Sequence, residues 1–106
     1  MINDEKIAEL LNKAECRLEG LPKGFWRIIK LSQPEIWETP EDAEFEYVWI
    51  VAIMGKHCIF YDDLNKGFVI GHYQINGELS ENLLGKSTFQ LNKLIENIVN
   101  SRFLFR

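Results

Sequence analysis

Apolar residues recur at helical spacing near both ends of the chain. In residues 4–18 they fall at offsets of 0, 3, 4, 7 and 11, on one helix face: Ile7, Leu10, Leu11, Ala14 and Leu18. Asp4 and Glu5 suit the N-terminal end of that helix. Near the C-terminus, Ser87 and Gln90 form a capping box before a second helical repeat: Leu91, Leu94, Ile95, Ile98 and Val99. The pattern predicts two amphipathic helices.

Four apolar segments between these helices predict β-strands, because they are rich in aromatic and β-branched residues. The first strand is expected after three residues that end the first helix, namely Gly20, Pro22 and Gly24. The predicted strands are residues 25–31, 45–54, 57–63 and 68–75, with short turns at 55–56 and 65–67 between the last three.

Residues 45–54 give the strongest strand pattern. Simple alternation puts Phe45, Tyr47, Trp49, Val51 and Ile53 on one side, and Glu46, Val48, Ile50, Ala52 and Met54 on the other. Because both sides become apolar from Val48 onward, we expect this strand in the centre of a sheet, covered on both faces. The short turns favour an antiparallel meander. The sequence therefore predicts an α+β fold: a four-stranded antiparallel sheet with N-terminal and C-terminal helices packed on it, forming one domain over residues 1–106.

Negative charge is concentrated in residues 34–46, between Pro34 and the strongest strand. This stretch has no Lys or Arg and six carboxylates: Glu35, Glu38, Glu41, Asp42, Glu44 and Glu46. The rest of the chain has 10 acidic and 12 basic residues, from totals of 16 and 12. Pro34 and Pro40 indicate a connection instead of a strand. The formal net charge of −4 argues against nonspecific binding to nucleic acid.

Trp37 lies inside this acidic stretch, and two interpretations of it stay open. An aromatic side chain surrounded by charge is typical of an anchor in a protein interface. Alternatively, Trp37 folds back and covers an edge of the sheet.

The residues that could carry chemistry form no clear catalytic or metal-binding set. His57 and Cys58 are adjacent on a predicted strand and point to opposite faces, and His72 has no evident third partner for a metal. Asp62 and Asp63 could hold a magnesium ion, but capping of the turn is the favoured interpretation. The Gly-Lys-Ser of residues 85–87 lacks the earlier glycine of a phosphate-binding loop. We expect no enzyme activity, no cofactor and no bound metal.

The two cysteines, Cys16 and Cys58, are far apart in the sequence and suggest neither a disulfide framework nor a zinc site. We expect Cys58 to be a buried free thiol, and a reducing compartment is compatible with both cysteines. The N-terminus does not have the pattern of a signal peptide, and no apolar run is long enough to cross a membrane. We expect a cytoplasmic protein without membrane association.

Residues 47–79 resemble a group of short bacterial immunity-type proteins, which neutralise secreted or contact-delivered toxins. The resemblance rests on a Trp-containing apolar strand, an aromatic strand ending in Tyr-Asp-Asp, and a following Gly-Phe: Trp49, Ala52, Tyr61, Asp62, Asp63, Gly67 and Phe68. It implies a protein that binds a cognate toxin and performs no chemistry.

This resemblance gives the acidic stretch a function. Many such toxins are nucleases with basic active sites, which an acidic protein can occupy. We expect the toxin-binding residues to be Glu35, Trp37, Glu38, Glu41, Asp42, Glu44, Glu46, Asp62 and Asp63. The alternatives are a small-molecule or enzymatic pocket near His57, His72 and Asp62, a structural interaction module, or a solvated acidic loop that serves solubility. The oligomeric state is not predicted.

Overall fold

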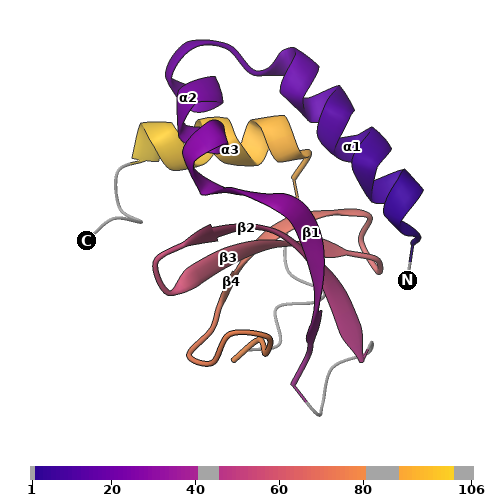
Figure 1. The fold of residues 1–106 in the computed structure, drawn as a ribbon. Coiled ribbons are helices and arrows are strands. Elements are labelled where there is room, and N and C mark those ends of the chain that lie inside the picture. Colours follow the sequence, from indigo (N-terminus) through magenta and orange to yellow (C-terminus); the bar gives the residue numbers. More distant parts are fainter. Residues whose placement is uncertain (1, 41–45, 81–88, 102–106) are drawn as a thin grey trace.

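The computed structural model describes residues 2–40, 46–80 and 89–101. In chain order, the elements are α1 (Asp4–Arg17), α2 (Gly20–Ile29), β1 (Lys30–Glu38), β2 (Tyr47–Met54), β3 (His57–Asp62), β4 (Gly67–His72) and α3 (Leu91–Ser101). The strands form one antiparallel sheet in the order β1-β2-β3-β4. Figure 1 shows the three helices together on one face of this sheet. The predicted α+β meander with packed terminal helices is confirmed.

The two predicted helices form where their apolar repeats lie. Asn3 caps α1, since its side chain accepts a hydrogen bond of 2.9 Å from the backbone N–H of Lys6. Ile7 and Ala14 of α1 are buried. In α3 four residues of the predicted stripe are buried, namely Leu91, Leu94, Ile95 and Ile98, whereas Val99 is half-buried. The predicted cap at Ser87 lies outside the described residues.

The prediction of a strand over residues 25–31 is wrong, because most of this segment belongs to α2. Trp26 and Ile29 are three residues apart and both buried, whereas Ile28 between them is 82% exposed. Pro22 lies in the first turn of α2, where a missing N–H removes no helical hydrogen bond. Burial of one helical face thus outweighs the strand preference of the individual residues.

The first strand lies further along the chain, and it includes the first part of the predicted acidic connection. β1 pairs with β2 at Lys30–Ala52 and again from Glu35–Ile50 onward, with an irregularity between the two. Pro34 falls in this interrupted stretch of an edge strand, where its missing N–H is tolerated. Residues 34–38 are therefore part of the sheet and not a loop.

β2 is covered on both faces, as predicted, but its simple alternation is broken. The pairing of β2 with β3 shifts register between Ile50 and Ala52. Val51 and Ala52 are consecutive, yet both belong to the cluster on the helical face. Val48 and Ile50 belong to the opposite cluster. The predicted assignment of faces is therefore wrong from Ala52 onward, because a bulge exchanges the two sides.

The sheet separates two hydrophobic clusters. The larger lies under the helices and includes Ile7, Trp26 and Ile95. The smaller lies on the opposite face and includes Trp37, Phe60 and Leu79. Leu79 comes from the segment after β4, which Figure 1 shows below the sheet. This segment returns to β1, because the Leu79 N–H donates to the Glu38 carbonyl at 2.9 Å.

Candidate functional site

Backbone contacts bring three exposed acidic residues from separate segments to the end of β1. The Glu38 N–H donates to the Gly77 carbonyl at 2.9 Å, and Glu38 forms a parallel bridge with Glu78. The Thr39 N–H donates to the Glu46 carbonyl at 3.0 Å, which holds Glu46 on the other side. We call Glu38, Glu46 and Glu78 the acidic end. The backbone contacts place Glu78 directly beside Glu38, and Glu46 on the adjoining strand.

The negative charge of the acidic end is not compensated within the described part of the chain. None of its three carboxylates forms an ion pair with a described residue. The ion pairs observed are elsewhere: Lys6–Glu9 at 3.6 Å, Lys30–Glu15 at 3.1 Å and Lys93–Glu96 at 3.9 Å. No basic side chain of residues 2–40, 46–80 and 89–101 neutralises these carboxylates.

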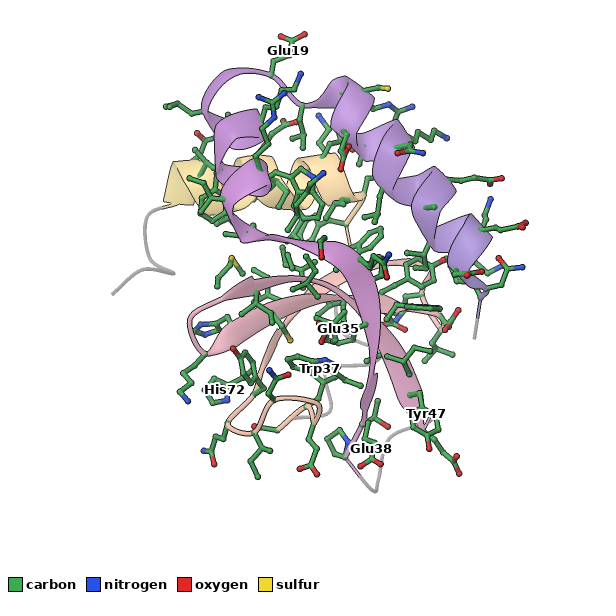
Figure 2. The ribbon with its side chains drawn as sticks, in the orientation of Figure 1. Glu19, Glu35, Trp37, Glu38, Tyr47 and His72 are labelled. Carbon is green, nitrogen blue, oxygen red and sulfur yellow. The ribbon has the colours of Figure 1, made fainter. Side chains whose placement is uncertain are left out.

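Apolar surface lies directly beside this charge. Tyr47 is paired with Glu38 across β1 and β2 and is 44% exposed. Ile36 is two residues from Glu38, so it lies on the same face of β1, and it is 49% exposed. Figure 2 shows Glu38 and Tyr47 at one end of the molecule, far from Glu19 at the other. The site thus combines free carboxylates with an exposed aromatic side chain.

The interpretation of Trp37 as an exposed anchor is wrong. Trp37 is 2% exposed and belongs to the smaller hydrophobic cluster. Its indole Nε1–H donates to Glu35 Oε1 at 2.9 Å, and its ring lies edge-on to Tyr73 with centroids 5.0 Å apart. The alternative, in which Trp37 packs against the sheet, is the correct one. Glu35 is exposed, but its carboxylate is engaged by this hydrogen bond.

Asp62 stabilises a turn and does not belong to an acidic surface. It is fully buried and accepts hydrogen bonds from the Leu64 N–H at 2.8 Å, the Asn65 N–H at 3.2 Å and Asn65 Nδ2 at 3.1 Å. This confirms the favoured interpretation of turn capping for Asp62. Asp63 is half-buried, and its Oδ1 accepts a hydrogen bond of 3.2 Å from the Ile2 N–H.

The other predicted toxin-binding residues divide into two groups. Glu38 and Glu46 lie together in the acidic end, whereas Glu41, Asp42 and Glu44 lie outside the described residues. The sequence analysis missed Tyr47, Ile36 and Glu78. Ile36 lies within the acidic stretch and Tyr47 directly follows it, so their positions in the sequence could have identified both residues. Nothing in the sequence pairs Glu78 with Glu38, since only the returning segment brings them together.

The histidines meet across β3 and β4, without forming a site for a metal. His57 pairs with His72, and their ring centroids are 5.6 Å apart. Within residues 2–40, 46–80 and 89–101, no group of three His, Cys, Asp or Glu side chains could hold a metal ion. A groove of about 580 Å³ lies between α1 and the start of β1, and its lining includes Asn12, Glu15 and Ser32 but neither histidine.

Cys58 is buried in the smaller cluster and Cys16 is exposed, and both are free thiols. Burial raises the pKa of the Cys58 thiol to about 12, against a smaller lowering by a hydrogen bond with the Gly71 backbone. Cys58 is therefore an unreactive core residue at neutral pH.

Among the helices described, none is both long and apolar enough to span a lipid bilayer. Comparison of the chain with protein-family models, with curated protein sequences and with solved structures found no match.

Proposed function

We propose that this protein is an immunity protein, which binds a cognate bacterial toxin through its acidic end and blocks the toxin's active site. The observation that carries the proposal is that Glu38 and Glu78 lie side by side, with Glu46 on the adjoining strand, and that none of the three forms an ion pair with a described residue. Like charges held together destabilise a fold slightly. A binding function gives a reason to keep them.

The chemistry favours a basic partner, and a nuclease toxin is a specific case of one. A nuclease active site carries positive charge because its substrate is a polyanion. The carboxylates of the acidic end would replace phosphate groups in that site. Complementary charge would also speed association, to roughly 10⁸ M⁻¹s⁻¹ or more at low salt. The residues Glu41, Asp42 and Glu44 lie between Glu38 and Glu46 in the sequence and would add to this charge.

Apolar contact is the second requirement of a stable interface, since surface ion pairs alone contribute little. Tyr47 replaces Trp37 as the proposed aromatic anchor, because it is exposed and lies opposite Glu38. Ile36 would extend this contact along β1. The protein would act in the cytoplasm by exclusion of substrate, without chemistry of its own.

The proposal is tested by capture followed by an inhibition assay. The tagged protein is used to capture basic proteins from lysates of bacteria that carry toxin genes, and each captured protein is assayed as a nuclease. We expect stoichiometric inhibition of the nuclease by the natural sequence. The double variant Glu38→Lys/Glu78→Lys should lose inhibition. The control Glu9→Lys/Glu19→Lys makes the same change in net charge in α1 and just after it, away from the acidic end (Figure 2), and should inhibit normally.

Three outcomes distinguish the immunity function from the choice of the acidic end as the binding surface. Equal inhibition by both double variants would show that the toxin is bound elsewhere. Capture of proteins that are not toxins, or that keep their activity when bound, would contradict the immunity function. Loss of inhibition by Tyr47→Ala, with unchanged stability, would support the aromatic contact.

A further inference from the structure

A small pocket lies where α1, the start of α3 and the turn between β3 and β4 meet. Its volume is about 100 Å³, enough for a group of a few heavy atoms. Three of its lining residues are cations from two elements: Lys13 and Arg17 of α1, and Lys66 of the turn. No carboxylate is among the described residues that line it. The pocket therefore has the opposite charge to the acidic end.

These cations are available to a ligand. None of the three forms an ion pair with a described residue. Arg17 Nη1 donates a hydrogen bond of 3.3 Å to Gln90 Oε1, which holds the guanidinium beside the start of α3. Gln90 also lines the pocket.

The start of α3 adds backbone donors that have no partner within the helix. The first hydrogen bond of this helix joins the Leu94 N–H to the Gln90 carbonyl at 3.0 Å. The N–H groups of Leu91, Asn92 and Lys93 precede it and have no partner within the helix. Leu91 and Asn92 line the pocket. The partial positive charge of the helix N-terminus favours an anion at this position.

Two buried polar side chains in the pocket wall have no hydrogen-bond partner among the described residues. Tyr61 and Asn92 line the pocket, and each is only 6% exposed. No polar side-chain atom of the described residues is both fully enclosed and without a hydrogen bond. The polar atoms of Tyr61 and Asn92 therefore keep some access to solvent, and both residues line the pocket.

Tyr61 is suited to donate a hydrogen bond. Burial, followed by the charges of Asp63 and Asp62, raises the pKa of its phenol, so the hydroxyl keeps its proton at neutral pH. The rest of the wall is apolar and includes Leu10, Phe68 and Phe89. A ligand with one anionic group and a short apolar part matches both kinds of surface.

We infer that this pocket binds a small organic anion through an oxyanion group, either carboxylate or phosphate. The group would contact Arg17 and the first N–H groups of α3, with Asn92 and Tyr61 as further donors. A short apolar substituent would lie against Phe68 and Phe89. The inference is independent of the proposed function, since it uses none of the residues of the acidic end.

The test is a titration of the ¹⁵N-labelled full chain at constant ionic strength, followed by NMR. Three probes are compared: inorganic phosphate, butyrate, and the neutral analogue butyramide. We expect saturable shifts of the amides of Leu91, Asn92 and Gly67 with at least one anion, and much smaller shifts with butyramide. Stronger binding of phosphate would indicate a phosphate group, and stronger binding of butyrate a carboxylate with an apolar part.

Matched variants locate the binding. Arg17 and Lys66 are exposed, so Arg17→Gln/Lys66→Gln should fold normally and bind the anion about tenfold more weakly. The control Lys23→Gln/Lys56→Gln makes the same change in charge away from the pocket and should bind normally. The inference is overturned if neither anion gives a saturable shift, if butyramide binds as well, or if both double variants bind equally.

Discussion

Trp37 and Tyr47 illustrate how residues of the same class differ in role. Both are aromatic residues on neighbouring strands, next to carboxylates. Trp37 points to the face that the returning segment covers, and it is buried. Tyr47, the first residue of β2, is on the same side of the strand as Trp49 and Val51, which face the helices, but it is exposed. The parity of a position in its strand, together with what covers each face, decides which residue can contact a partner.

Truncation of these two residues should therefore lower the free energy of unfolding by very different amounts. Trp37→Ala removes a fully buried ring and its hydrogen bond to Glu35, so we expect a loss of about 3–5 kcal/mol in the free energy of unfolding. Tyr47→Ala should cost less than about 1 kcal/mol, since its ring is nearly half exposed. Urea denaturation measures both. A larger loss for Tyr47→Ala would contradict this assignment of core and surface.

Cys58 predicts how stability depends on pH. Its thiol has a pKa of about 12 in the folded protein, compared with an ordinary value of 9.0. Above pH 9 the unfolded chain loses this proton while the folded protein keeps it. The protonated Cys58 thiol therefore makes its full contribution to the free energy of unfolding below pH 9. This contribution is lost between pH 9 and pH 12, by up to about 1.4 kcal/mol per pH unit.

Urea denaturation at several pH values from neutral to alkaline measures this dependence. The natural sequence should lose stability more steeply above pH 9 than the variant Cys58→Ala, whatever their difference at neutral pH. Parallel curves for the two proteins would contradict the prediction. In the folded protein at pH 8, a thiol reagent should modify Cys16 alone.

At the scale of elements, the largest difference from the sequence-based prediction is the boundary between α2 and β1. The aromatic and β-branched residues of the Phe25–Ile29 stretch favour a strand, but Trp26 and Ile29 are spaced to bury one helical face. Glu15 of α1 reinforces this arrangement, because its Oε1 accepts hydrogen bonds from Trp26 Nε1 at 3.0 Å and Lys30 Nζ at 3.1 Å. A long-range contact thus helps to determine local structure.

Two adjacent isoleucines test the helical register of α2. Ile29 is buried among the residues of the larger cluster, whereas Ile28 is almost fully exposed. Ile29→Lys should lower the free energy of unfolding by more than about 3 kcal/mol, because an unpaired charge would enter the core. Ile28→Lys should change it by less than about 0.5 kcal/mol. Thermal or urea denaturation distinguishes the two, and comparable losses would contradict the register.

At the scale of the whole molecule, the segment after β4 has two consequences. It covers the smaller cluster with Leu79, and it places Glu78 beside Glu38. The core and the acidic end therefore depend on the same closure of the chain onto β1. The cations of the pocket lie on α1 and on the turn between β3 and β4, whereas the acidic end lies at the end of β1. The folded protein thus carries two surfaces of opposite charge on different elements.

Because the segment after β4 places Glu78 beside Glu38, we expect Glu78 to lower the stability of the fold while it strengthens binding to a basic partner. Glu78→Gln removes repulsion from Glu38, so it should raise the free energy of unfolding by about 0.5 kcal/mol at low salt. High salt should abolish this gain, because it screens exposed charges. The same variant should weaken binding to a basic partner. Urea denaturation at two salt concentrations measures the first effect, and a loss of stability in Glu78→Gln would contradict it.

The sequence alone determined the fold class, the two terminal helices, the central strand and the turn at Asp62. These features depend on local periodicity and on turn chemistry, which a single chain segment carries in its own residues. The sequence also identified the acidic residues Glu38 and Glu46 as a candidate surface.

Only the tertiary structure decided the identity of α2, the burial of Trp37, the exchange of faces in β2 and the meeting of Glu38 with Glu78. Each depends on residues distant in the sequence. Trp26 is helical because a helical face can be buried there, and Trp37 is buried because the segment from 77 to 79 returns to β1. Local patterns limit what a segment can form, whereas burial and pairing with distant segments select among the possibilities.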